Sequence, residues 1–290
     1  MINAYLESLE FEKRSSEHTI SSYKTDLEQF SRYLFEQYET KEPETASPAM
    51  LRSWVVKLME DGLSPVSVNR KIASLRSYYG FLRKKGLVKM DPSKMLAVLK
   101  TRKKLPVYVE EKSMELLFDA EIFPTDDSGL RDKLIMELLY GSGIRLSEIL
   151  GLEIAHIDIR AKTIRVLGKR AKERLIPVSS LVVELLSKYM TVRAPEENTD
   201  VLILTDSGKA AYPVFIQRVV KRYLSAVTTL KQKSPHVLRH TYATHLLNRG
   251  ADLNAIKELL GHTNLAATQI YTHNSIEKLK KTHQQAHPKA

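Results

Sequence analysis

Apolar residues in the first 85 positions recur at steps of three and four, which is the spacing of one buried helix face. Such stripes run over residues 20–34 and 68–82, and shorter ones lie at 2–11 and 51–58. Amphipathic helices of this kind bury their apolar faces against one another. The pattern therefore predicts a small four-helix bundle in this part of the chain.

After residue 108 the pattern mixes helical and strand periods. Runs of alternating residues at 163–167 and 173–178 flank a polar loop and predict a β-hairpin. Gly250 and Gly261 stand where helix C-caps belong. The predicted fold class is mainly α with a small β-hairpin, an α+β chain of two domains. Helices are expected at residues 112–120, 128–142, 146–150, 181–189, 213–227, 236–249 and 253–260.

The positive charge is concentrated in one segment. The 290-residue chain has a net charge of +11, and residues 51–105 alone carry 14 Lys and Arg against 3 Asp and Glu. The rest of the chain is therefore neutral in sum. A basic segment of this length indicates a polyanionic partner such as a nucleic acid, with a solvated basic surface as the alternative.

Cations beside the apolar stripe of the helix at 68–82 could lie against phosphates or enter a major groove. We assign residues 1–95 to a DNA-binding domain, 96–108 to a linker that itself touches DNA, and 109–290 to a second domain. An ordinary flexible linker is the alternative. The predicted DNA-binding residues are Arg70, Lys71, Arg76, Arg83, Lys100, Arg102, Lys103 and Lys104.

Composition excludes several classes of protein. The chain has no cysteine, which excludes disulfides and thiolate metal sites. It has no run of about 18 apolar residues that could span a membrane, and its first residues lack the apolar core of a signal peptide. We expect a cytoplasmic protein.

Three segments carry candidate chemistry: GSGIRLSEILGL at 141–152, HVLRHTYATHLL at 236–247 and LLGHTNLAATQIYTH at 259–273. Alone, each has an ordinary structural explanation: a surface arginine, a helix histidine, a core tyrosine. Together and in this order they resemble the tyrosine recombinase (phage integrase) family, and within it the Xer recombinases. The resemblance covers nearly the whole chain, including the helical first domain, and makes the second domain the catalytic one.

The resemblance implies a catalytic set on the second domain. Tyr271 would attack a DNA phosphate and form a 3′-phosphotyrosine, His236 would accept its proton, and Lys169 would protonate the leaving 5′-oxygen. Two guanidiniums, Arg145 and Arg239, suit the charge that develops on the non-bridging oxygens. The implied set is Arg145, Lys169, His236, Arg239, His262 and Tyr271, supported by Glu148.

Two assignments within this set have competitors. Lys169 is preferred to Arg170 and Lys172 because it directly follows Gly168, as in the family's pattern. Glu148 lies three residues after the first catalytic arginine, on the same helical face, and is expected to orient the pocket. A helix-surface glutamate is the alternative.

The histidines do not suggest a metal site. His262 is expected to donate a hydrogen bond to the scissile phosphate. His236 and His240 have the spacing of a metal pair, but no glutamate lies between them as in a zinc protease, and no third ligand is evident. We therefore expect no metal, and interpret His240 and His245 as structural.

The resemblance also implies partners. The candidate partners are a double-stranded DNA site, another tyrosine recombinase in a homo- or hetero-tetramer, and a DNA translocase. The tail after Tyr271, with Ile276 and Leu279 at helical spacing, is expected to pack into a neighbouring protomer. Strand exchange keeps its bond energy in the protein–DNA ester, so no cofactor is expected, and the chain has no GK[ST] phosphate loop.

Site-specific recombination, with chromosome-dimer resolution as its role, is the predicted function. A mobile-element integrase of the same family and a non-catalytic DNA-binding relative are the alternatives. A type IB topoisomerase shares the catalytic residues but has a different domain plan. An RNA-binding module would need an aromatic pattern that the sequence lacks.

Overall fold

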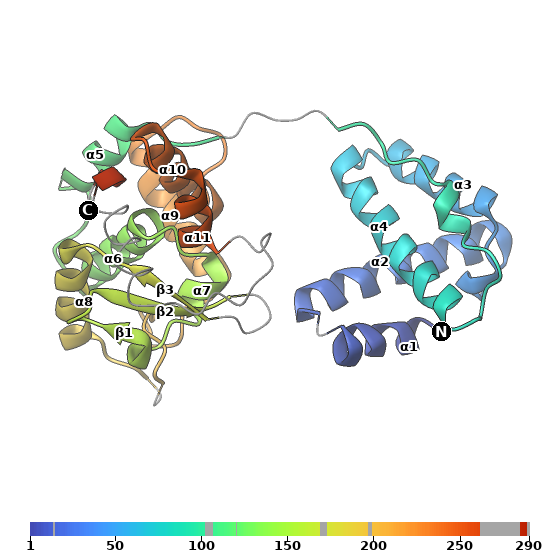
Figure 1. Cartoon of the computed structure of the whole chain (residues 1–290), viewed down its shortest axis with the longest axis horizontal. Helices are drawn as coiled ribbons and strands as arrows, with labels where there is room; N and C mark the ends of the chain where they lie inside the picture. The colour runs from blue at the N-terminus through green and yellow to red at the C-terminus, as the bar shows by residue number, and fades with distance from the viewer. Residues whose placement is uncertain are drawn as a thin grey trace. The chain divides into compact units, whose positions relative to one another are not determined.

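The computed structural model of the chain describes residues 1–13, 15–101, 107–119, 121–168, 173–196, 199–261 and 285–288. The chain forms two compact units, residues 1–104 and 105–290 (Figure 1). Both are mainly helical, and the second holds a small antiparallel sheet, which confirms the predicted fold class. No helix within the described ranges is long and apolar enough to cross a membrane.

The first unit is a bundle whose three longest helices begin at serine caps. The hydroxyls of Ser16, Ser47 and Ser64 each accept a hydrogen bond from the main-chain N–H three residues later. These bonds satisfy donors that a helix start leaves free. The elements are α1 (Ile2–Glu7), a π-helical turn (Ser8–Glu12), α2 (Glu17–Tyr38), a 3-10 turn (Pro43–Thr45), α3 (Pro48–Glu60), α4 (Pro65–Lys84) and a 3-10 turn (Pro92–Met95).

The apolar stripes of these helices form the core of the first unit. Leu27, Phe30 and Leu34 of α2 are fully buried. The Phe30 ring packs on Trp54 of α3, with centroids 5.0 Å apart, and Leu75 of α4 is buried in the same cluster. Helical periodicity was therefore sufficient to locate this core.

Leu96 and Leu99, which lie in the predicted linker, are bound by residues of α4. The amide of Asn69 makes two hydrogen bonds to the main chain of Leu99, of 2.9 and 2.8 Å. Arg76 donates to the carbonyl of Leu96 over 2.7 Å. Since Asn69 satisfies both main-chain polar groups of Leu99, as a neighbouring strand would, the first unit extends beyond the predicted boundary at residue 95.

In the second unit, helices surround a sheet with the strand order β1-β2-β3 (Figure 1). The strands β2 (Thr163–Leu167) and β3 (Glu173–Pro177) form the predicted hairpin, and β1 (Ile157–Asp158) is too short to show a period. The helices of the described part are α5 (Glu111–Asp119), α6 (Asp127–Gly141), α7 (Leu146–Leu150), α8 (Ser180–Val192), α9 (Pro213–Val227), α10 (Pro235–Asn248) and α11 (Leu253–Leu260), with a 3-10 turn at Ile154–His156.

The buried helix of this unit is α6. It packs against α7, α8, α9 and α10, and Leu134, Ile135, Leu138 and Leu139 are fully buried. Because α6 is covered on all sides, it holds its C-terminal end and the following turn in a fixed place. That turn carries the first of the candidate catalytic residues.

The described part of the tail lies on its own chain. Ala286 is buried with Tyr242 and Leu246 of α10 and Leu259 of α11. This placement of residues 285–288 differs from the predicted packing of the tail into a neighbouring protomer. The remainder of the predicted tail helix lies outside the described residues.

Candidate active site

The turn between α6 and α7 depends on a glycine. Gly143 has a left-handed backbone with φ of 61°, and a Cβ there would lie 2.5 Å from Cδ1 of the buried Tyr242. Only glycine takes this conformation without strain and leaves room for the ring. The tight turn brings Arg145 to the start of α7.

Arg145 and Glu148 are joined as the sequence spacing predicts. The main-chain N–H of Arg145 donates to Oε2 of Glu148 over 2.8 Å, and its guanidinium donates to Oε1 over 2.7 Å. Glu148 is buried, and burial alone would raise the pKa of its carboxyl. The hydrogen bonds and charge of Arg174, with those of Arg145, outweigh burial and lower the pKa to about 2. Glu148 is therefore an anion that orients Arg145.

Arg239 reaches the same place from α10. It is buried, and its guanidinium donates to the carbonyls of Gly143 and Leu260. Burial, followed by the positive charges of Arg145 and Arg174, lowers the pKa of Arg239 to about 9, which still leaves it protonated at neutral pH. A cation held beside other cations would be stabilised by an added anion.

Arg174 is the residue that sequence reasoning missed. It lies on β3 and is buried, and its guanidinium donates to both carboxylate oxygens of Glu148. A signal was present in the strand pattern, because Arg174 and Ile176 face inwards while Glu173 is exposed. An arginine at an inward position of a strand needs a buried partner.

Three cations and one carboxylate thus meet in the described part of this site. The carboxylate of Glu148 forms ion pairs with Arg145 and Arg174, and its charge also acts on the nearby guanidinium of Arg239. The cluster has an excess of positive charge, and the Arg145 side chain remains 31% exposed. Such a site suits an anion with several oxygen acceptors, of which a phosphodiester is one.

The other candidate catalytic residues are placed only in part. His236 is exposed at the start of α10, three residues before Arg239. Lys169, His262 and Tyr271 lie outside the described residues. In the chain, Lys169 belongs to the loop between β2 and β3, and His262 directly follows Gly261, which caps α11.

Metal ligands are not gathered in the described ranges. No group of three or more His, Asp or Glu side chains there is arranged to hold a metal ion. The positive groups of the site are guanidiniums instead.

The predicted DNA-binding cations that the structure describes fall into two groups. Lys71 is buried, and its ammonium donates to Asp26 over 2.8 Å and to Gln29. Arg70 also pairs with Asp26 but remains partly exposed. Burial would raise the pKa of Asp26, but its bonds to Arg70, Lys71 and Ser74 lower it. Lys71 therefore stabilises the bundle interior.

The second group of cations faces solvent. Arg76, Arg83 and Lys100 are exposed, although Arg76 also holds the main chain at Leu96. Arg102, Lys103 and Lys104 lie outside the described residues.

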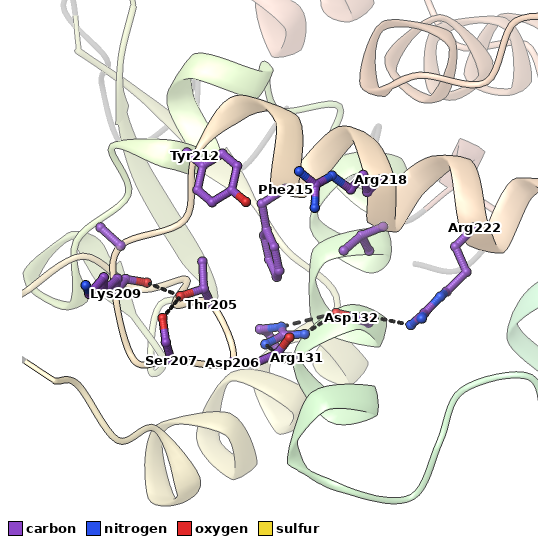
Figure 2. A pocket seen from close by; sticks show the side chains of 12 residues that line it. Arg131, Asp132, Thr205, Asp206, Ser207, Lys209, Tyr212, Phe215, Arg218 and Arg222 are labelled. Carbon is purple, nitrogen blue, oxygen red and sulfur yellow. Dashed lines mark hydrogen bonds and ion pairs between the residues drawn. The ribbon is translucent and has the colours of Figure 1, made fainter.

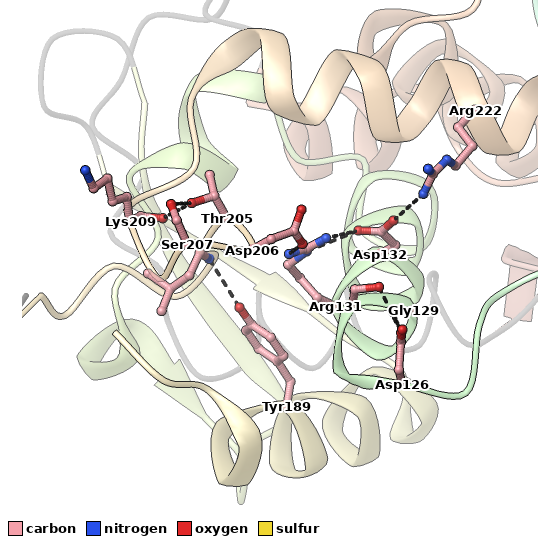
Figure 3. Close-up of polar contacts among 12 residues, drawn as sticks. Asp126, Gly129, Arg131, Asp132, Tyr189, Thr205, Asp206, Ser207, Lys209 and Arg222 are labelled. Atoms are coloured by element: carbon pink, nitrogen blue, oxygen red, sulfur yellow. Dashed lines mark hydrogen bonds and ion pairs between the residues drawn. The ribbon is translucent and has the colours of Figure 1, made fainter. Parts of the chain in front are cut away.

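A cavity of about 750 Å³ lies between the start of α6, the turn at residues 205–210 and α9 (Figure 2). Its polar wall is a chain of ion pairs that runs from Asp206 through the buried Arg131 to Asp132 and on to Arg222 (Figure 3). None of the candidate catalytic residues that the structure describes lines it. The cavity is therefore separate from the arginine cluster.

Comparison with known families follows the same division of the chain. The Phage integrase family matches residues 93–278, and the phage integrase N-terminal SAM-like domain matches residues 2–86. Together these matches include all six predicted catalytic positions and both units.

Two relatives that match this chain along its whole length are named tyrosine recombinase XerC. The tyrosine recombinase XerC of Chlorobaculum tepidum is 35% identical over 317 residues, covering 100% of this chain and 94% of that protein. The tyrosine recombinase XerC of Bacillus subtilis is 35% identical over 295 residues, covering 100% and 96%.

Solved structures show the same fold at lower identity. The Tn1549 transposon integrase in complex with circular intermediate DNA is 21% identical with a TM-score of 0.70, over 96% of this chain and 97% of that one. The XerH site-specific recombinase bound to difH is 22% identical with a TM-score of 0.70, over 97% and 83%.

Proposed function

Since the chain belongs to the phage integrase family, we propose that it cleaves and rejoins DNA through an ester between Tyr271 and a 3′-phosphate. Its full-length relatives make it a tyrosine site-specific recombinase. The observation that supports this chemistry is the arginine cluster around Glu148, whose excess charge a phosphodiester would complement.

The proposed cleavage step exchanges one phosphate ester for another. The Tyr271 hydroxyl oxygen attacks phosphorus, and the bond from phosphorus to the 5′-oxygen breaks. His236 accepts the tyrosine proton, and Lys169 donates a proton to the leaving 5′-oxygen. Arg145 and Arg239 bind the non-bridging oxygens, where negative charge develops.

Rejoining is the same reaction in reverse, with a 5′-hydroxyl from the partner strand as nucleophile. One phosphorus–oxygen bond forms for each that breaks, so the step needs neither ATP nor another cofactor. His262 is proposed to donate a hydrogen bond to the phosphate. The non-catalytic alternative has no use for this complete set of residues.

The proposed substrate is a double-stranded DNA recombination site. We propose that Arg70, Arg76, Arg83 and Lys100 contact its phosphates, with Arg102, Lys103 and Lys104 of the connecting segment. Lys71 is left out because its ammonium is buried against Asp26. We also propose that the enzyme is cytoplasmic and assembles as a tetramer, alone or with a second tyrosine recombinase. A DNA translocase is a further proposed partner.

The proposed role is resolution of chromosome dimers. It is supported by XerC-named relatives that match this chain along its whole length. The solved neighbours do not separate this role from that of a mobile-element integrase, because XerH and the Tn1549 integrase share the fold equally well. Deletion of the gene should give filamented cells with unresolved chromosomes. Normal division, with loss only of excision of a mobile element, would favour the integrase.

The nucleophile is tested by trapping the ester. Genomic DNA that becomes covalently linked to the wild-type protein is sequenced, and a nicked suicide duplex of that site is incubated with protein in EDTA. Tyr271→Phe should bind the duplex and give no adduct. Tyr212→Phe is the matched control, because it removes a hydroxyl from an exposed tyrosine of the same unit and should react as wild type. An adduct with Tyr271→Phe, no linked DNA with wild type, or a strict need for a divalent ion would contradict the proposal.

A further inference from the structure

Three consecutive carbonyls at the end of α11 each accept a hydrogen bond from a different arginine of the site. Arg174 donates through Nε to Leu259 over 3.3 Å, Arg239 donates to Leu260, and Arg145 donates to Gly261 over 2.9 Å. The last carbonyls of a helix have no partners within it and carry partial negative charge. The arginines therefore fix this helix end as well as the anion site.

Arg174 differs from the other two arginines in where its main chain lies. It is the second residue of β3, and it pairs across the hairpin with Val166 of β2. The loop that joins these strands carries Lys169. Arg174 is thus at the loop end of the hairpin, while its guanidinium reaches Glu148 on α7 and Leu259 on α11.

We propose that Arg174 is a positioning residue for strand cleavage, which ties the start of β3, directly after the loop that carries Lys169, to the carboxylate that holds Arg145. This inference rests on the proposed function, because it uses the role of Lys169 as proton donor. The Arg174 side chain thereby fixes the strand that follows this loop against the carboxylate that orients Arg145.

The geometry requires a guanidinium at this position. Its two Nη atoms bind the two oxygens of Glu148 while Nε binds the Leu259 carbonyl. A lysine ammonium keeps the charge but cannot span three acceptors with a planar fork. The stem is also closely packed, since a Cβ added to Gly261 would lie 3.0 Å from Cδ of Arg174.

The same hairpin provides a matched control. Arg165 on β2 is exposed and pairs across the strands with exposed Glu173 at 3.7 Å. An exposed pair of this kind contributes little to stability. Arg165→Lys and Arg174→Lys therefore make the same change on opposite faces of one hairpin, and only the second breaks the link to Glu148.

The experiment compares two leaving groups on the suicide duplex under single-turnover conditions. One duplex has the natural 5′-oxygen at the scissile phosphate, and the other has a 5′-bridging sulfur, which leaves as a thiolate and does not need a proton. Lys169→Ala is measured beside both hairpin variants, because it should be rescued by sulfur if Lys169 is the proton donor.

We expect Arg174→Lys to cleave the oxygen duplex on the order of 100-fold more slowly than wild type, as misplacement of a catalytic group by about 1 Å can do. The sulfur leaving group should recover at least about 10-fold of that loss, while Arg165→Lys should match wild type on both duplexes. A loss of folded protein would slow both duplexes by one factor, so partial unfolding cannot imitate this rescue.

The outcomes separate the two proposals. Equal losses of Arg174→Lys on the oxygen and sulfur duplexes, with Lys169→Ala rescued, would overturn the positioning role and leave the proposed function intact. If sulfur rescues neither variant, the role of Lys169 fails, and the inference that rests on it fails with it. Wild-type rates for Arg174→Lys on both duplexes would also overturn the inference.

Discussion

The main-chain carbonyl of Val109 accepts a hydrogen bond from Nε2 of His245 over 3.0 Å. Because a carbonyl can only accept, Nε2 carries the proton, and Nδ1 is left to accept from the Tyr140 hydroxyl at 3.0 Å. The N–H of Val109 donates to Thr241, one turn earlier on α10. The helix that carries Arg239 therefore holds the start of the catalytic unit through a neutral histidine.

Stability of the second unit should consequently fall at mildly acidic pH. Burial lowers the pKa of His245 below its usual 6.5, and the charge of Glu111 and the Val109 hydrogen bond offset this only in part. The unfolded chain then binds the proton more readily, so this stabilisation is present above about pH 6.5 and is lost as pH falls towards the folded pKa. Because burial also lowers the pKa of His240 in the same unit, His245→Gln should reduce this dependence between pH 7.5 and 5.5 and not abolish it.

Calorimetry can measure this effect with an internal control. The only tryptophan, Trp54, is buried in the first unit, so its fluorescence follows unfolding of that unit. The heat-absorption peak of the second unit should shift less with pH in His245→Gln than in wild type. An identical pH shift in both proteins would contradict the assignment of a neutral His245.

Gly143→Ala should lower the free energy of unfolding more than Gly250→Ala, although both glycines have a left-handed backbone conformation. Gly250 has φ of 82° and nothing within 4 Å of an added Cβ, so its replacement costs only the backbone strain, about 1–2 kcal/mol. At Gly143 the methyl would also overlap the Tyr242 ring, adding about 1–3 kcal/mol. The free energy of unfolding of both variants is measured in urea. Equal losses would show that overlap with the Tyr242 ring adds no cost at Gly143.

Features with a local cause could be predicted from the sequence. The bundle helices follow from apolar periodicity and the hairpin from alternation. The link between Arg145 and Glu148 follows from their spacing at a helix start. The order of the motifs indicated the family, and comparison with known proteins confirmed it.

Features that depend on distant residues could not be predicted in this way. Asp26 lies 45 positions from Lys71 and holds its ammonium inside the bundle, so a residue on a basic helix face proved to be internal. Asn69 binds the main chain 30 positions away at Leu99. In both cases tertiary packing determines the partner, and a periodic pattern in the sequence does not identify it. The strand pattern could have indicated that Arg174 is buried, but not that its partner is Glu148 on another element.

Replacement of Glu148 by Gln should lower stability at neutral pH and change the response to acid. The variant leaves Arg174 buried without its carboxylate, a loss of about 3–5 kcal/mol. In wild type, the lowered pKa of Glu148 contributes about 3 kcal/mol that is present above pH 4.5 and is lost as pH falls to about 2. The difference between the two proteins should therefore shrink as the pH falls. A constant difference from pH 6 to pH 2.5, measured by calorimetry, would contradict the low pKa.

Arg83 and Lys71, on the same basic helix, should behave differently when their charges are removed. Arg83 is exposed at the end of α4, so Arg83→Ala should weaken DNA binding and leave stability close to that of wild type. Loss of one phosphate contact should also reduce the slope of log Kd against log salt by about 0.9. Lys71→Met should leave DNA binding close to that of wild type and lower the free energy of unfolding by about 1–3 kcal/mol, because it removes the hydrogen bonds from the ammonium to Asp26 and Gln29.

The salt dependence of DNA binding and the stability are both measured on wild type, Arg83→Ala and Lys71→Met. Binding to the mapped duplex is titrated at several salt concentrations, and unfolding of the first unit is followed by Trp54 fluorescence. Lys71 lies near the Trp54 ring, with Nζ 5.9 Å from its centroid, so midpoints are compared and signal amplitudes are not. If Lys71→Met lowered the salt slope as much as Arg83→Ala does, the buried lysine would have to reach DNA. The bundle would then open on binding, because the Asp26 contact and a phosphate contact cannot both hold one buried ammonium.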